Sequence, residues 1–197
     1  MDDIRKNVQE HIYSQLSKPD VILSEREIAQ KFDLKRGNVR EILLSMEGEG
    51  ILERLPQRGY RCINYQDTDQ QAVWTIRYAT EHEAVRRAIE AADREDLVRL
   101  ALLLEEMEQH LKEHDYNKFA MVDMEFHTAL VAASRDNFLI RVFAFMSATV
   151  FRLNRNDETK ATEALKSHRE IYEHFKNRDW PETEKALRFH LGRGVSL

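Results

Sequence analysis

The sequence predicts a mostly α-helical protein of two domains, with its β structure confined to a short hairpin in the first third. Apolar residues recur at helical spacing through most of the 197 residues. Two short β-type runs, 51–55 and 60–63, flank a turn that contains proline and glycine. Strand patterns cease after residue 63, and the length suffices for two modest domains with separate cores.

The first domain begins with three predicted helices. An apolar residue at every fourth position makes residues 4–16 an amphipathic helix. Ser24 and Glu27 have capping-box spacing, which predicts a helix from Glu25 to about Phe32. After a turn at 33–34, the next helix turns apolar side chains inward at Val39, Ile42, Leu43 and Met46. Its other side carries Lys35, Arg36, Asn38 and Arg40, and Gly48 and Gly50 end it.

The hairpin completes a winged helix-turn-helix. In this fold the helix that follows the turn, here the one that starts near Lys35, lies in the major groove of DNA. Arginine at the start of that helix can grip guanine through two hydrogen bonds. Arg58 lies in the predicted turn, 56–59, and is therefore expected to reach the DNA backbone or the minor groove.

Residues 4–64 resemble the DNA-binding domain of the GntR family of bacterial transcription regulators. The likeness is carried by four motifs: LSEREIA at 23–29, KRGNVREIL at 35–43, MEGEGIL at 46–52 and QRGYRCI at 57–63. It implies DNA contacts from Arg26, Arg36, Arg40, Arg58 and Gly59, to which the helix pattern adds Lys35 and Asn38. Lys35 replaces the Ser or Thr usual in the family, which removes a helix cap, and the turn at 17–20 is shortened.

Charge and cysteine content narrow the function further. The net charge is −5, but residues 1–64 contain 11 Lys and Arg against 11 Asp and Glu. A neutral DNA-binding module gains little from charge alone, so we expect it to act as a homodimer on a matched double-stranded DNA operator. The single Cys62 fits a reducing cytoplasm, and the longest apolar stretch, 142–151, is too short to span a membrane.

The remainder is predicted to be an antiparallel all-α bundle. We expect a DNA-binding domain at 1–64, a linker at 65–71 and a helical effector and dimerisation domain at 72–197. Polar breaks at Asp93, Asp115, Asn137, 156–159 and Asp179 separate six predicted helices. Their expected ranges are 69–91, 94–113, 116–133, 138–155, 160–177 and 181–192.

Four side chains in this bundle form a candidate metal site. Asp123 and His127, four residues apart, fall on the inward flank of their helix. His168 and His190 lie among the core residues of the last two helices. A buried carboxylate needs a cation or a full set of donors, and three imidazoles beside it suit a divalent transition metal.

Residues 69–192 resemble the FCD effector domain of the FadR subfamily, whose metal-binding members share three motifs. These are D-x-x-x-H, at 123–127 here, a histidine opening "HR.I", at 168–171, and a last histidine in "HL", at 190–191. Six helices suit the smaller, VanR-like variant of this effector domain. The resemblance implies zinc or nickel at Asp123, His127, His168 and His190, and a small organic acid as effector. The family's "R..LE" aligns with 77–81, which makes Arg77 a candidate effector contact.

The leading interpretation is a ligand-responsive transcription regulator, a repressor that binds a palindromic operator as a dimer without any membrane partner. One alternative is a metal-dependent hydrolase, since three histidines, an Asp and an open position can activate water. Against an enzyme, no HExxH-type helix places a general base beside the metal, and Glu125 lies on another face from Asp123. A further alternative is an architectural DNA-binding protein with a purely structural metal.

Overall fold

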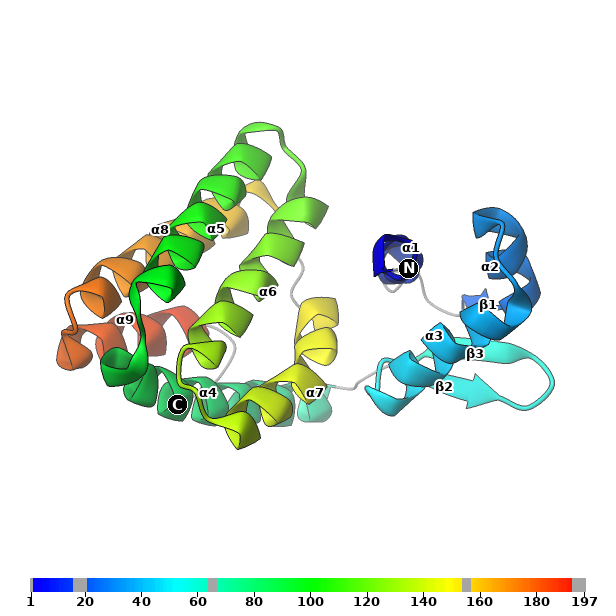
Figure 1. The fold of residues 1–197 in the computed structure, drawn as a ribbon, viewed down its shortest axis with the longest axis horizontal. Helices are drawn as coiled ribbons and strands as arrows, with labels where there is room; N and C mark the ends of the chain where they lie inside the picture. Colours follow the sequence, from blue (N-terminus) through cyan, green and yellow to red (C-terminus); the bar gives the residue numbers. More distant parts are fainter. Residues whose placement is uncertain (1, 16–20, 64–66, 154–156, 193–197) are drawn as a thin grey trace. The chain divides into compact units, whose positions relative to one another are not determined.

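A computed structural model describes residues 2–15, 21–63, 67–153 and 157–192 (Figure 1). The chain divides into two compact units, residues 1–66 and 67–197. The fold is mostly α-helical, as predicted, and its strands all lie in the first unit among the described residues.

The described part of the first unit has three helices and a small sheet. The helices are α1 (Asp2–Gln15), α2 (Glu25–Phe32) and α3 (Arg36–Gly48), and the strands are β1 (Ile22–Leu23), β2 (Leu52–Leu55) and β3 (Gly59–Cys62). The sheet is antiparallel with the order β1-β3-β2. Inward side chains of α1 and α3 are fully buried at Val8, Ile12, Val39, Leu43 and Met46. The unit is a winged helix-turn-helix, with β2 and β3 as the wing.

Two details of this unit differ from prediction. The strand β1 was not expected, because two residues are too few to show an alternating pattern, and its pairing with β3 at Leu23 and Tyr60 is a tertiary contact. The capping box is wrong: α2 begins at Glu25, yet the Ser24 side chain makes no cap hydrogen bond. The helix start coincides with the end of β1, and the Ser24 carbonyl accepts from the Ile28 amide at 3.1 Å.

The described part of the second unit contains six helices. They are α4 (Asp67–Ala91), α5 (Arg94–Lys112), α6 (Tyr116–Ala132), α7 (Asn137–Leu153), α8 (Glu158–Lys176) and α9 (Trp180–Gly192). Their ends lie within about three residues of those predicted, because local caps set several of them. Asp93, Asp115 and Asp157 accept hydrogen bonds from backbone amides in the first turns of α5, α6 and α8.

The helix α4 begins at Asp67, inside the segment 65–71 that was expected to be a linker. The stretch 67–71 contains neither glycine nor proline, so nothing local stops the helix from extending to its N-terminal end. Residues 64–66, like the shortened turn at 17–20, lie outside the described part of the chain.

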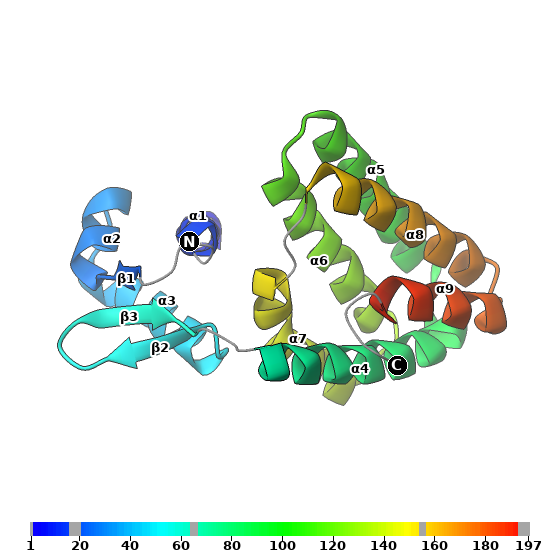
Figure 2. The same ribbon diagram turned by 180° about the vertical axis from the view of Figure 1, so that it is seen from behind.

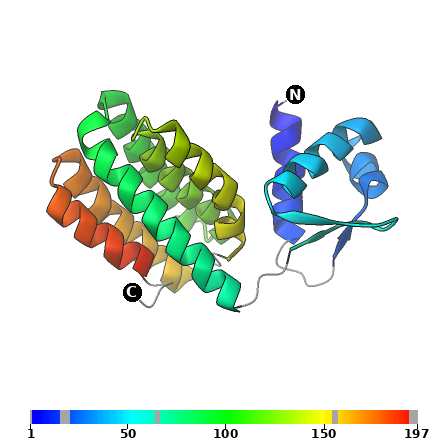
Figure 3. The same cartoon turned by 90° about the horizontal axis from the view of Figure 1, so that it is seen from below.

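The helix α6 is the centre of the bundle. It packs against α4, α5, α7 and α8 (Figures 1 and 2), and its side chains are buried on several faces, including Phe119, Phe126 and Leu130 in the main core. The helices of this unit run side by side when seen from below (Figure 3). Within the described residues, no helix is long and apolar enough to cross a membrane.

Candidate metal centre and nucleic-acid interface

The start of α3 presents a polar face opposite the buried one. Lys35, Arg36, Asn38 and Arg40 are all exposed, as is Arg26 on α2. Lys35 occupies the N-cap position and makes no side-chain cap, as its replacement of Ser or Thr predicted. The Nε of Arg40 lies 4.0 Å from Glu25 Oε1, a distance that orients the guanidinium loosely toward the neighbouring helix. The face therefore offers donors for phosphates and base edges.

The wing places Arg58 in an exposed turn, where its amide donates to the Leu55 carbonyl at 3.1 Å. Gly59, predicted as a DNA contact, has a structural reason to be glycine. Its φ is +110°, and a Cβ there would lie 2.4 Å from the carbonyl oxygen of Leu23 in β1. The residue allows the wing to pair closely with β1.

Replacing Gly59 with alanine should therefore destabilise the first unit by about 1–3 kcal/mol, since it adds both a strained φ and a clash with backbone. Urea unfolding followed by circular dichroism measures the effect. Gly37→Ala is the matched control, because a Cβ at Gly37 meets nothing within 4 Å. Equal stability of the two variants would contradict this explanation of Gly59.

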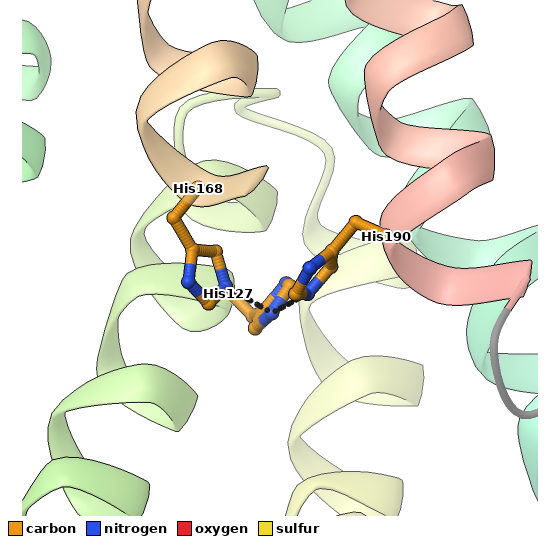
Figure 4. Close-up of side chains that lie close together, drawn as sticks. All are labelled: His127, His168 and His190. Carbon is orange, nitrogen blue, oxygen red and sulfur yellow. Dashed lines mark hydrogen bonds between the residues drawn. The ribbon is translucent and has the colours of Figure 1, made fainter. Parts of the chain in front are cut away.

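Three histidines meet inside the second unit (Figure 4). His127 comes from α6, His168 from α8 and His190 from α9, and one ring nitrogen of each lies within 4.8 Å of the others. The Nε2 atom of His127 is 3.0 Å from His168 Nε2 and 3.1 Å from His190 Nε2. His127 and His168 are fully buried, and His190 is partly buried.

Asp123, the fourth predicted ligand, lies beside this group. It is 1% exposed, and its Oδ1 is 3.4 Å from His168 Nε2. The structure thus brings the three predicted histidines together and places the carboxylate at their edge, next to His168.

A hydrogen bond to Glu81 assigns the tautomer of His127. His127 Nδ1 lies 2.6 Å from Glu81 Oε2, and a carboxylate only accepts, so Nδ1 carries the proton. His190 Nδ1 lies 2.8 Å from Ser167 Oγ, and this hydroxyl also lies 2.9 Å from the Ala164 carbonyl oxygen. The hydroxyl has one proton, so it either donates to His190 Nδ1 or accepts from it. The Nε2 lone pair of His127 is directed at Nε2 of His168 and of His190.

A proton on either ring nitrogen can bridge the 3.1 Å between His127 Nε2 and His190 Nε2. When each ring carries its proton on Nδ1 instead, both Nε2 lone pairs are available to a metal ion. Imidazole nitrogens with one carboxylate oxygen are a donor set that suits zinc and nickel, so the residues present fit a divalent transition metal.

Glu81 and Ser167 support the site but were not predicted to. Glu81 is fully buried on α4 and also accepts from Arg77 Nε at 2.5 Å. Burial, the largest single influence, opposes ionisation of Glu81, but the charges and hydrogen bonds of Arg77 and His127 outweigh it and lower the pKa to about 2. The i, i+4 spacing of Arg77 and Glu81 is a sequence signal for a pair, whereas the contact with His127 spans 46 residues.

Arg77, the predicted effector contact, is 3% exposed. Its guanidinium lies over the Trp74 ring, with its central carbon 5.3 Å from the ring centre. Its Nη2 is buried without a hydrogen-bond partner among the described residues. An unpaired donor on a buried cation is costly and favours an anionic acceptor.

Comparison with known families agrees with both units. Residues 1–61 match the family described as bacterial regulatory proteins, gntR family, and residues 72–193 match the FCD domain. The chain belongs to the GntR family and carries an FCD domain. It is a DNA-binding, ligand-responsive transcription regulator rather than an enzyme, and the hydrolase alternative is set aside on that ground.

Relatives of this GntR-family regulator match it over most of its length. It is 25% identical over 184 residues to the HTH-type transcriptional regulator YdhC of Bacillus subtilis, covering 91% of this chain and 82% of that protein. It is also 25% identical to the transcriptional repressor RspR of Escherichia coli, covering 88% and 77%. Among solved structures, Escherichia coli McbR/YncC has the same fold, with a TM-score of 0.83, 20% identity and coverage of 96% and 94%.

Proposed function

We propose that this regulator is a repressor that binds a palindromic operator as a homodimer and is controlled by a small carboxylate at a divalent metal in its FCD domain. The observation that carries the proposal is the convergence of three histidine nitrogens within 4.8 Å, with the Asp123 carboxylate 3.4 Å from His168 Nε2. The metal would be held by Asp123, His127, His168 and His190.

The DNA-binding half of the proposal is supported by the exposed basic face of α2, α3 and the wing, which carries Arg26, Lys35, Arg36, Asn38, Arg40 and Arg58. Residues at the start of α3 would contact the base edges, because recognition helices contact bases through their N-terminal part. We assign Arg26 and Arg58 to contacts with DNA phosphates. Gly59 is assigned to the close approach of the wing backbone to the DNA.

The homodimer is supported by apolar side chains on two helices that pack together, α4 and α7. Ile76 is 50% exposed, Phe138 74% and Phe145 60%. Phe138 and Phe145 are seven residues apart, so they share one face of α7. Large exposed aromatics on one face favour burial against a second copy, which gives the two DNA-binding units needed for a palindrome.

Phe145→Glu should convert the dimer to a monomer, because it places a charge in the proposed apolar contact. Sedimentation velocity measures the change. Leu102→Glu serves as the control, since Leu102 is 58% exposed on α5, away from this pair of helices. A wild-type protein that sediments as a monomer both free and on DNA would remove the dimer from the proposal.

The effector is assigned to the metal site and Arg77 together. A divalent metal supplies an electrophilic centre to which carboxylate oxygens can bind. Arg77 contributes the buried Nη2, which lacks a partner among the described residues and suits a second carboxylate oxygen. A small acid that bears two or more acceptor oxygens fits this pair of contacts best.

The proposal is tested on DNA. An operator is selected from a random library by the protein itself, and small carboxylates are screened by thermal shift on the metal-loaded protein. We expect an acid that raises the melting temperature also to weaken operator binding by about 5- to 150-fold, the usual size of such coupling. If the stabilising acids leave operator affinity unchanged, the protein is an architectural DNA-binding protein with a structural metal.

A further inference from the structure

The buried ion pair on α4 reaches the histidine cluster through one carboxylate. Glu81 accepts from Arg77 Nε at 2.5 Å through one oxygen and from His127 Nδ1 at 2.6 Å through the other. All three side chains are at most 3% exposed. Each oxygen of Glu81 thus has its own donor, and water does not compete for either.

This arrangement fixes the tautomer of His127. A neutral imidazole carries a single N–H, and Glu81 holds it at Nδ1. The Nε2 lone pair is then directed at His168 Nε2 and His190 Nε2, 3.0 and 3.1 Å away. With the other tautomer, His127 would point an N–H at the cluster and could not bind a metal there.

The histidine cluster draws its ring nitrogens from α6, α8 and α9 in the described chain, whereas Glu81 belongs to α4. We propose that Glu81 is the positioning residue of the metal site: it selects the tautomer of His127 that can bind a metal and links α4 to the three helices that supply the histidines. The inference rests on the proposed metal site, but the tautomer exists without any metal.

Replacing Glu81 with glutamine tests this inference, because the amide can satisfy both Arg77 and His127 in only one orientation. Its amide has one accepting oxygen and one donating nitrogen, while Arg77 donates only. The oxygen must therefore face Arg77, and the NH₂ must face His127. His127 can accept at Nδ1 only by moving its proton to Nε2, which points an N–H into the cluster.

We expect Glu81→Gln to shift the His127 proton from Nδ1 to Nε2 in the metal-free protein, read by ¹⁵N shifts in long-range proton–nitrogen correlation spectra. Zinc affinity, measured by competition with a chromophoric chelator, should fall about 10- to 100-fold, the usual loss when a group supporting a ligand is removed. Glu83→Gln is the matched control on the same helix, because Glu83 pairs with Arg86 and Arg87 outside the cluster. It should leave the tautomer unchanged and zinc affinity within about twofold.

A His127 that keeps its proton on Nδ1 in Glu81→Gln, together with wild-type zinc affinity, overturns the inference. If that variant does not fold, the double variant Arg77→Met with Glu81→Leu removes both charges at once and replaces them with apolar side chains. It should lose zinc affinity by a similar factor, and wild-type affinity in the folded double variant also overturns the inference. A wild-type protein that binds no zinc refutes the proposed metal site alone, because the tautomer is measured without metal.

Discussion

His168→Ala and His190→Ala should each lower metal affinity by about 100-fold or more, because each removes a ligand, whereas loss of a group that only supports a ligand costs about 10- to 100-fold. Both side chains have a ring nitrogen within 4.8 Å of the other histidines. Metal content after dialysis and zinc affinity by chelator competition measure the change directly.

The same variants should lose stabilisation by metal. At a metal concentration about 100 times the dissociation constant, binding stabilises the wild-type fold by about 2.7 kcal/mol, and a variant with 100-fold weaker binding loses most of this. His174→Ala is the control on the same helix as His168, since His174 lies outside the histidine cluster. Its melting temperature should respond to zinc as the wild type does.

These variants also test the role that is proposed for the metal. If the effector binds through the metal, a variant without metal should neither bind the acid nor release the operator in its presence. By linkage, an effector that weakens DNA binding must itself be held less tightly by the DNA complex, and by the same factor. Variants that lose metal yet respond to the acid as the parent does would falsify the metal-centred switch.

Arg36→Ala and Arg40→Ala should each cost about 1–3 kcal/mol in binding to the selected operator and less on random DNA, because arginine at the start of a recognition helix reads base edges. Fluorescence anisotropy at one fixed salt concentration compares the two DNAs. Arg26→Ala and Arg58→Ala should instead weaken binding to both DNAs alike. Each should also reduce the slope of the logarithm of affinity against the logarithm of salt concentration by about 1.

Two controls accompany this comparison. Arg99→Ala removes an exposed arginine from α5 in the other unit and should leave DNA binding unchanged. Glu25→Gln removes the carboxylate that lies 4.0 Å from Arg40 Nε, and it should strengthen binding slightly by freeing that guanidinium. Equal losses on operator and random DNA for Arg36→Ala would show that this arginine contacts phosphate rather than bases.

Local signals in the sequence determined most of the helical framework. The six helices of the second unit were predicted to within about three residues because aspartates that cap their own first turns, such as Asp93 and Asp157, act over three or four residues. The inward positions of α3 followed from helical period alone. For the same reason, the inward direction of Asp123 and His127 on one flank of α6 was readable from spacing.

Tertiary structure decided the contacts that link distant segments. The pairing of β1 with β3, and with it the need for glycine at 59, depends on residues nearly 40 positions apart. The Glu81 carboxylate meets His127 across 46 residues, and the Ser167 hydroxyl meets His190 across 23. A buried hydrogen bond of this kind leaves no periodic trace in the chain, because each partner is one polar residue in an otherwise apolar stripe. The sequence by itself therefore identified the three histidines, whereas only the packing of α4, α6, α8 and α9 decided which nitrogen each of His127 and His190 turns toward the others.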